Sequence, residues 1–369
     1  MPTCDTCGKD FSQKRYTIHL ARKNPCKAPD EKGEKVQEEK DTVEAVKPFL
    51  KWVGGKTQIL DTVLSRFPPE MDNYHEPFLG GGSVLICLLG KKRQGHIVIR
   101  GTIYASDVNP HLIGLYHNIQ TDVDAVIGHL QEFIVECPAY EGKAEKGVNR
   151  VPSSLEEAKE CAETYYYWIR GRYNALSSEE KVTALGSAMF LFLNKMCFRG
   201  VYREGPRGFN VPFGNYKNPS VFEERHLRLV SEWIQPVVFR CRGFADSLGD
   251  GEVREGDFVY LDPPYAPEKK TSFVGYTADG FGEEDHVSLF AQCHRIKEKG
   301  VGILMSNADV ALVREAFPVD GWVTERVLCR RAIHSKSPDA QTNEVLIACR
   351  QSYLSVGATF LTGRYNQHT

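Results

Sequence analysis

Short runs of hydrophobic residues alternate with segments of helical spacing over the last third of this chain. β-Branched and aromatic residues dominate the runs and turn residues bound them, which predicts buried strands. The predicted strands are 258–261, 301–307, 323–329 and 343–349. Hydrophobic residues at helical spacing predict one helix between the first two strands, 287–297, and another after the second strand, 310–317. Strands that alternate with helices predict an α/β fold with a mostly parallel sheet.

The same alternation organises the segment from Pro48 to about residue 119. Hydrophobic residues at helical spacing follow a Gly-Gly turn at 54–55, and an apolar helix follows the glycine-rich turn 80–82. A strand at 103–105 then precedes a helix that starts at Asn109-Pro110. We therefore expect this segment to share one sheet with the last third.

Between residues 119 and 239 the alternation gives way to helical segments and loops, which predicts a helical domain inserted into the sheet-forming core. Near the amino terminus, mixed charges without an aromatic residue are typical of a linker. The predicted boundaries are a small amino-terminal domain (1–28), a linker (29–46), the first part of the core (47–119), the inserted domain (120–239) and the second part of the core (240–369).

Composition narrows the class of protein. The chain has 369 residues, is 41% hydrophobic and carries a formal charge of −2, so any binding to nucleic acid must come from local patches. No apolar stretch is long enough to span a bilayer and no secretion signal is evident, so we expect a soluble intracellular protein, in cytoplasm or nucleus. Eleven cysteines in that setting indicate thiols and metal ligands. Those expected to be buried are Cys87, Cys161, Cys197, Cys293 and Cys349.

The predicted strand 258–261 stops at Asp262-Pro263-Pro264-Tyr265. In open α/β sheets, ligands bind beyond the carboxyl ends of strands, so these residues are candidate catalytic residues. The Asp262 carboxylate and the Pro263 carbonyl could accept the N–H bonds of an exocyclic amine on a nucleobase and aim its lone pair at an electrophilic methyl group. Tyr265 would stack on the base. A strand that merely ends in a proline turn is the alternative interpretation.

Two glycine turns indicate a cofactor pocket. Trp52 and Lys56 flank the first turn, and Gly80 to Gly82 could bring backbone N–H groups close to a polar ligand. Asp107 ends the next predicted strand, where an acidic residue commonly binds ribose hydroxyls. The pattern therefore predicts an adenosine-type cofactor. A nicotinamide dinucleotide is the alternative, disfavoured because the chain lacks G-x-G-x-x-G.

The amino terminus carries one ligand set for tetrahedral zinc. The residues are Cys4, Cys7, His19 and Cys26. Their spacing resembles a zinc finger of C2HC type, and the lysines and arginines around them suit phosphate. We expect a structural Zn²⁺ and a role in tethering DNA; an unmetallated basic tail is the alternative.

Basic and aromatic residues alternate along a glycine- and proline-rich segment, 185–219. That combination fits phosphate contacts together with base stacking or wedging. The basic members are Lys195, Arg199, Arg203, Arg207 and Lys217, and the aromatic members are Phe198, Tyr202, Phe209, Phe213 and Tyr216. An exposed basic loop on a helical domain is the alternative. A second polar loop, 266–286, could close over the site as a lid.

Five segments stand in one order: KWVGGK, EPFLGGGS, SDVNP, FNVPFGNYK and LDPPY. Together, from about Pro48 to Arg350, they resemble the D12 class of DNA adenine-N6 methyltransferases, the Dam-type family of the α group. The resemblance implies a Rossmann-like core that binds S-adenosylmethionine, a helical target-recognition domain inserted before the catalytic motif, and a flipped adenine held by residues 262–265. The implied donor-pocket residues are Trp52, Lys56, Glu76, Phe78, Gly80, Asp107 and Asp262.

The resemblance also implies residues for DNA. Arg203 falls where a guanine-reading arginine is expected, Phe198 and Arg199 fall where residues wedge into or contact the duplex, and Arg207 and Lys217 complete the basic set. Dam-type enzymes favour GATC, although Arg199 and Val201 depart from the pattern expected in that loop. We expect duplex DNA as the partner, allow for a restriction endonuclease partner, and expect a monomer or weak dimer.

Two other functions use the same features. Methylation of cytosine N4 or of adenine in RNA relies on the same amine chemistry, and Asp at the first position of the 262–265 motif favours adenine in DNA. A zinc-finger DNA-binding protein with an inactive methyltransferase fold is the alternative of a different class. Intact Lys56, Asp107 and Asp262 argue against it.

Overall fold

In a computed structural model of the chain, the structure describes residues 46–140, 142, 147–217, 219–267, 280–330 and 341–349. The chain divides into two units, residues 1–44 and 45–369, and the described residues belong to the second unit. The expected zinc finger and most of the expected linker lie outside them. Within these ranges, no helix combines the length and the apolar character needed to cross a membrane.

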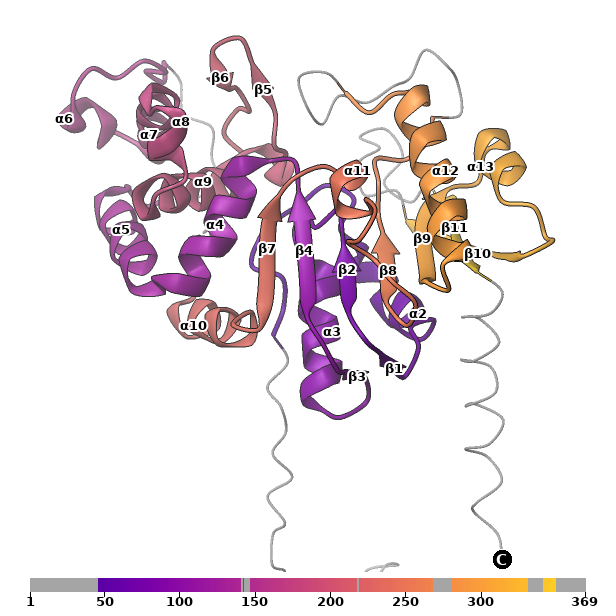
Figure 1. The fold of residues 1–369 in the computed structure, drawn as a ribbon. Helices are drawn as coiled ribbons and strands as arrows, with labels where there is room; N and C mark the ends of the chain where they lie inside the picture. Colours follow the sequence, from indigo (N-terminus) through magenta and orange to yellow (C-terminus); the bar gives the residue numbers. More distant parts are fainter. Residues whose placement is uncertain are drawn as a thin grey trace, which may run out of the picture. The chain divides into compact units, whose positions relative to one another are not determined.

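A mixed sheet of seven strands organises the described residues (Figure 1). Its order is β10-β11-β9-β8-β2-β4-β7. The strands are β2 (Tyr74–Glu76), β4 (Ile103–Asp107), β7 (Val237–Cys241), β8 (Phe258–Leu261), β9 (Gly302–Ala308), β10 (Trp322–Arg330) and β11 (Gln341–Cys349). Neighbours from β9 through β7 pair in parallel, and β11 pairs antiparallel with both β9 and β10. The prediction of a mostly parallel α/β sheet is therefore confirmed.

Two short strand pairs lie outside this sheet. β1 (Glu70–Met71) pairs in parallel with β3 (Val98–Ile99), and β5 (Glu204–Gly205) forms a hairpin with β6 (Gly208–Phe209). The hydrophobic pattern did not predict them, because strands of two residues are too short to show a period of two.

Helices connect and flank the parallel strands. They are η1 (Lys56–Gln58), α2 (Leu60–Leu64), α3 (Ser83–Arg93), α4 (Pro110–Thr121), α10 (Glu224–Trp233), α11 (Phe244–Ser247), α12 (Glu283–Glu298) and α13 (Ala311–Ala316). α4 starts where the sequence predicts, because the Asn109 side chain accepts hydrogen bonds from the N–H groups of His111 and Leu112, and Pro110 occupies the first helical position.

The segment between α4 and α10 is helical. It contains α5 (Val123–Glu136), α6 (Leu155–Ala158), α7 (Ala162–Ala175), α8 (Ser178–Lys181), α9 (Ala184–Met196) and η2 (Phe198–Gly200). α9 is its centre, because ten of its thirteen residues are buried and it packs on α4, α5 and α7. Figure 1 shows these helices gathered beyond the β7 edge of the sheet.

β8 lies in the middle of the sheet and is buried on both faces. All four of its residues are at most 1% exposed. Val259 and Leu261 face a core that α12 completes with Leu289 and Phe290. On the opposite face, Phe67 packs on Phe258 and Tyr260. This two-sided burial fixes the position at which β8 ends.

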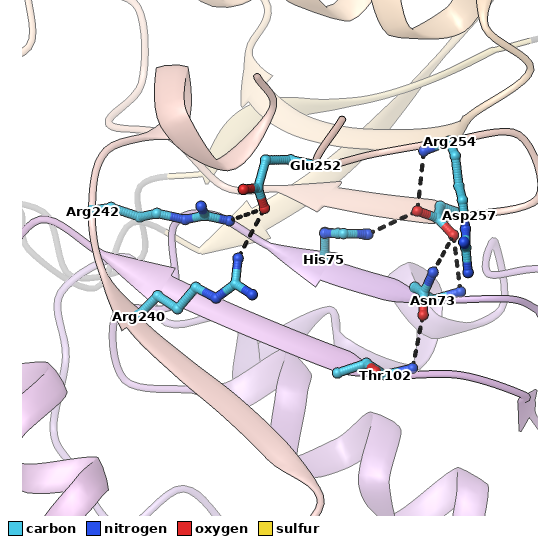
Figure 2. Close-up of polar contacts among 8 residues, drawn as sticks. All are labelled: Asn73, His75, Thr102, Arg240, Arg242, Glu252, Arg254 and Asp257. Carbon is cyan, nitrogen blue, oxygen red and sulfur yellow. Dashed lines mark hydrogen bonds and ion pairs between the residues drawn. The ribbon is translucent and has the colours of Figure 1, made fainter. Parts of the chain in front are cut away.

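A buried polar network ties β2 to the residue before β8 (Figure 2). Asp257 accepts hydrogen bonds from His75 Nε2 at 3.0 Å, from Asn73 Nδ2 at 2.7 Å and from the N–H of Arg254 at 3.2 Å. Asn73 Oδ1 in turn accepts from the N–H of Thr102, just before β4. Burial alone would raise the pKa of Asp257, but the hydrogen bonds and the charge of His75 lower it. The network sets the register of the three central strands from the end opposite the site.

The cysteines mostly behave as predicted. Cys161, Cys197, Cys293 and Cys349 are buried, but Cys87 is only partly buried, so that prediction was wrong. Cys87 lies one turn before Lys91 on α3, on the side of the helix that reaches solvent.

Candidate active site

The carboxyl end of β8 places Asp262 beside a buried lysine from the start of the domain. Lys56 Nζ lies 2.6 Å from Asp262 Oδ1 and donates to the Gly54 carbonyl at 2.8 Å. The Lys56 side chain is 4% exposed and that of Asp262 is 21% exposed, so water screens the ion pair weakly. Burial raises the pKa of Asp262, and the charge of Lys56 opposes that rise. Lys56 therefore favours the carboxylate, the form that accepts hydrogen bonds.

Glu76, the last residue of β2, is a second buried acid at this edge. It accepts a hydrogen bond from the Tyr74 hydroxyl at 2.7 Å. Burial raises the pKa of Glu76 to about 8; the bond from Tyr74 works against the rise, and the nearby charge of Asp262 adds to it. Glu76 is therefore mostly protonated at neutral pH, and its carboxyl group can donate as well as accept.

Asp107 ends β4 and braces the glycine-rich turn. Its Oδ2 accepts from the N–H of Gly80 at 3.0 Å, and its Oδ1 accepts from the N–H of Asn109 at 3.0 Å. Burial raises the pKa of Asp107, and these backbone N–H groups oppose the rise. Each carboxylate oxygen can still accept one further hydrogen bond, such as one from a ligand hydroxyl.

The glycines of the turn are required by protein packing. A Cβ on Gly81 would lie 2.7 Å from Trp52 Cβ, and a Cβ on Gly82, whose φ is 64°, would lie 2.2 Å from the Tyr116 hydroxyl oxygen. Trp52 and Tyr116 thus fill the side of the turn where larger residues would project. The Tyr116 hydroxyl itself is buried and has no hydrogen-bond partner among the described residues. A polar ligand atom at this turn would satisfy it.

Tyr265 completes the catalytic motif and is held by a residue that sequence reasoning missed. Its hydroxyl donates to Glu344 Oε2 on β11 at 2.7 Å, and Lys56 Nζ lies 4.9 Å from the centre of its ring. Pro263 is buried and Pro264 is partly exposed. Glu344 comes 79 residues after Tyr265, and the local sequence carries no sign that the two meet.

An aromatic group lies among the elements that follow β2 and β7. The rings of Phe78 and Phe244 are stacked with centroids 5.7 Å apart, and Phe281 meets Phe78 edge-on at 5.9 Å. All three side chains are partly buried. Phe78 was predicted as a pocket residue. Phe244 was missed because the strand that precedes it, β7, was not predicted and begins within the expected helical domain.

A loop from α9 reaches the glycine turns. A pocket of about 280 Å³ is lined by residues at the two glycine turns and by two residues that follow α9, Arg199 and Tyr216. The other lining residues are Pro48, Leu50, Lys51, Trp52, Gly55, Gly81 and Ser83. Trp52 also stacks on Tyr202, with ring centroids 6.0 Å apart. The structure therefore brings part of the predicted DNA-binding segment next to the predicted donor pocket.

The tip of this loop is strained and exposed. Arg199 has a left-handed backbone, with φ 57° and ψ 16°, which is uncommon for any residue other than glycine. Phe198 is 48% exposed, and the Arg199 guanidinium lies 5.2 Å from the centre of its ring. Gly200 cannot be replaced easily, because a Cβ there would lie 2.2 Å from Lys51 Cβ.

The β5–β6 hairpin presents further cations. Arg203 is exposed, and its Nε donates to Asn210 Oδ1 at 2.6 Å, which orients the guanidinium. Arg207 lies in the turn of the hairpin, and both Arg207 and Lys217 are exposed. Lys195 differs from the other basic residues: burial and the charge of Lys51 lower its pKa to about 8.

The aromatic members of the segment are mostly structural. Phe209 and Phe213 are each 4% exposed, and Tyr202 hydrogen-bonds to His111 Nδ1 at 3.0 Å. Phe209 and Phe213 cannot stack on bases without leaving the core. Phe198 is exposed and Tyr202 and Tyr216 are partly exposed, so the prediction of interleaved stacking residues was wrong for Phe209 and Phe213.

Two predicted features fall on residues that the structure does not describe. The expected zinc ligands Cys4, Cys7, His19 and Cys26 lie there, as does most of the expected lid, 268–279. In the part of the chain that is described, no group of three or more His, Cys, Asp and Glu side chains is arranged to hold a metal ion.

Comparison with known proteins places this site in a family. Residues 52–328 match the D12 class N6 adenine-specific DNA methyltransferase family. The type II methyltransferase M.MjaIII of Methanocaldococcus jannaschii is 35% identical over 300 residues, which cover 79% of this chain and 94% of that protein. The DNA adenine methylase of Haemophilus influenzae is 31% identical (79% and 89% covered), and that of Escherichia coli K12 is 32% identical (73% and 83% covered). The chain therefore belongs to the D12 class N6 adenine-specific DNA methyltransferase family.

Proposed function

We propose that this adenine-specific DNA methyltransferase transfers the methyl group of S-adenosylmethionine directly to N6 of an adenine flipped out of duplex DNA. The observation that carries the proposal is the shielded ion pair between Lys56 and Asp262 at the end of β8, on the same edge of the sheet as Glu76 and Asp107. An amine attacks without a protein nucleophile, and the site needs only acceptors and a fixed geometry.

The chain's own residues prepare the amine. The Asp262 carboxylate and the Pro263 carbonyl accept the two N–H bonds of N6, which draws the nitrogen lone pair out of conjugation with the ring. S-adenosylmethionine supplies an electrophilic methyl group on a sulfonium. The amine would become cationic on methylation, and Asp262 would stabilise that charge until a proton leaves to water. Pro264 stiffens the turn, and Tyr265 stacks on the base.

The donor pocket is the edge formed by β2 and β4. The buried Tyr116 hydroxyl without a partner and the free lone pairs of Asp107 suit a polar ligand at the glycine turn. We propose that Asp107 accepts from ribose hydroxyls and that the rings of Phe78 and Phe244 contact the adenine of the donor. Trp52, Lys56, Glu76, Gly80 and Asp262 line the remainder of the pocket.

We propose that the predicted target-recognition domain, 120–239, is inserted between the two parts of a Rossmann-like core, 47–119 and 240–369. Its last residues, from 237, form the start of β7, a strand of the core sheet. The exposed loop of the domain supports this role: Phe198 would wedge into the duplex, Arg199, Arg207 and Lys217 would contact phosphates, and Arg203 would read a guanine. We propose GATC as the target, on the resemblance of residues 209–217 to Dam-type enzymes.

The amino-terminal segment is proposed as a zinc-binding DNA tether. Cys4, Cys7, His19 and Cys26 would hold one structural Zn²⁺, and residues 29–46 would link this finger to the core. Metal analysis of the purified protein tests this directly: we expect one zinc per chain and its loss in Cys7→Ser. A protein without bound zinc would contradict it.

Relatives named type II methyltransferases support a restriction endonuclease as a functional partner. We propose that the methyltransferase itself acts as a monomer or weak dimer, which light scattering at micromolar concentration would test.

Sequencing that detects modified bases tests the proposed function. The protein and S-adenosylmethionine are incubated with unmethylated duplex DNA of mixed sequence, with Asp262→Ala as the control. We expect N6-methyladenine at one recurring motif with the wild type and none with the variant. Methylcytosine, or an unmodified duplex together with modified RNA, would contradict the proposal.

A further inference from the structure

The catalytic turn 262–266 is held from both sides, and one of the residues that hold it, Asn307, is an unusual choice for its position. Lys56 binds Asp262, Glu344 accepts from the Tyr265 hydroxyl, and Asn307 Oδ1 accepts from the N–H of Ala266 at 3.0 Å. Pro263 and Pro264 have no N–H group, so few backbone donors are available to anchor this turn.

Asn307 sits deep in the core at the carboxyl end of β9. It is 0% exposed, it pairs with Val345 of β11, and it follows Met305 and Ile303 on the same face of the sheet. Apolar side chains fill that face. A hydrophobic residue would therefore suit this position better if only the stability of the core mattered.

The orientation of the Asn307 amide is fixed by its contacts. Oδ1 accepts from two backbone N–H groups, those of Ala266 at 3.0 Å and Ala308 at 2.8 Å, so the amide cannot be reversed without setting donors against donors. As a result, Nδ2 is buried with no partner among the described residues. A buried polar atom without a partner is costly. Asn307 nevertheless provides the acceptor for the N–H group of Ala266, the last residue of the catalytic turn.

Glu344 contacts the catalytic turn from the adjacent residue pair of the same two strands. It pairs with Ala308 in the β9–β11 ladder, directly beside the pair of Asn307 with Val345. Its Oε2 fixes the Tyr265 hydroxyl at 2.7 Å and so sets the plane of the ring. The end of the β9–β11 ladder thus contributes two acceptors to two successive residues of the turn.

We propose that Asn307 and Glu344 are positioning residues for methyl transfer: they hold the Pro263 carbonyl and the Tyr265 ring in the arrangement that receives the flipped adenine. The proposal rests on the proposed catalytic role of residues 262–265. Asn307 and Glu344 hold the part of the turn that faces the adenine. Replacing either residue should therefore impair placement of the target base and slow methyl transfer, whereas binding of the methyl donor should be preserved.

The test uses the full-length protein with Asn307→Leu, Glu344→Leu and Glu344→Gln, and Ser306→Ala as the matched control. Ser306 is equally buried on β9, and Ser306→Ala removes a 2.9 Å hydrogen bond to Tyr260, a residue of β8 outside the turn. Three quantities are measured: kcat at saturating DNA, the Kd of S-adenosylmethionine, and the fluorescence of 2-aminopurine at the target position, which reports base flipping.

We expect Asn307→Leu and Glu344→Leu to lower kcat by about 10- to 100-fold and to reduce the 2-aminopurine signal, with the Kd of the donor within about threefold of the wild type. Glu344→Gln keeps an acceptor for the Tyr265 hydroxyl and should recover most of the activity. If Asn307→Leu does not fold, the Glu344 pair decides alone. Wild-type kcat in the leucine variants, or an equal loss in Ser306→Ala, would overturn the proposal. An active Asp262→Ala would instead overturn the proposed function.

Discussion

Lys56 and Asp262 lie 206 positions apart in the sequence, yet their side chains meet at 2.6 Å with little exposure to water. The first follows the Gly-Gly turn that opens the domain, and the second ends the central strand β8. This contact joins the proposed donor pocket to the proposed catalytic turn. It also controls the charge of the acid, because burial raises the pKa of Asp262 and only the lysine opposes that rise with a full charge.

The rate of methyl transfer should depend on pH through Asp262. Asp262 must be ionised to accept from the amine, so activity should fall as the pH drops through its raised pKa. Lys56→Met removes the opposing charge, raises that pKa further and should move the acid limb of kcat to higher pH by about 1 unit or more. Rates at saturating donor and DNA between pH 5 and 9 measure this. The exposed Lys92→Met serves as control, and an acid limb that does not move would show that Asp262 is not the titrating group.

Glu76 should make the protein less stable as the pH rises. The pKa of Glu76 in the folded protein is about 8, which exceeds the pKa of a glutamate in the unfolded chain. Between these two pKa values the folded protein keeps a proton that the unfolded chain has lost, so the free energy of unfolding falls as the pH rises. Relative to Glu76→Gln, the wild type should lose roughly 2–4 kcal/mol of unfolding free energy from pH 5 to pH 8.5. Urea unfolding of both proteins at the two pH values gives the comparison. A difference that stays constant would mean that Glu76 titrates normally.

Arg199 combines backbone strain with a proposed DNA contact. Asn adopts the left-handed region more readily than Arg, so Arg199→Asn should raise the unfolding free energy by about 0.5–1 kcal/mol. The same change removes a cation, so DNA binding should weaken and its salt slope should fall by about 1. Arg207→Asn is the matched control, because it removes an equal charge without relieving strain. Equal stability of the two variants would refute the strain argument.

Arg203 should govern sequence choice. Asn210 accepts from its Nε at 2.6 Å and from its Nη2 at 3.5 Å, which orients the exposed guanidinium. Arg203→Ala should reduce the preference for the correct base at one position by about 1–3 kcal/mol, roughly 5- to 150-fold in kcat/KM, whereas Lys217→Ala should weaken all duplexes equally. Kinetics on the target and on singly substituted duplexes distinguish the two. A uniform loss with Arg203→Ala would make it a phosphate contact.

Local patterns predicted those parts of the site that a single segment of chain carries. The run 258–261 predicts β8 because both of its faces are buried, and Asp262 follows from where that run stops. Asp107 and the α4 cap at Asn109 follow in the same way. In each case hydrophobicity and turn chemistry act within a few residues.

Contacts between distant strands left no local trace. Glu344 and Asn307 reach the catalytic turn only because β11 and β9 pair beside β8, and an isolated Glu or Asn on a strand gives no sign of that. For Phe209 and Phe213 the sequence led to the opposite error, because these buried rings were assigned to a DNA-binding surface. Composition made them resemble a stacking surface, and only the packing around α7 and α9 shows that they belong to the core.

The role of Asp262 in adenine methylation is tested most directly by single-turnover methyl transfer with the wild type and Asp262→Ala. The substrate is an unmethylated duplex that contains the motif found by sequencing, and mass spectrometry identifies the product nucleoside. We expect N6-methyldeoxyadenosine from the wild type and a rate at least about 1,000-fold lower from the variant, which loses an acceptor and the partner of Lys56. The Kd of S-adenosylmethionine is measured for both proteins, so that a slower methyl-transfer step can be distinguished from weaker binding of the donor. Wild-type rates from Asp262→Ala, or a methylated base other than adenine, would show that Asp262 does not prepare an adenine amine for methyl transfer.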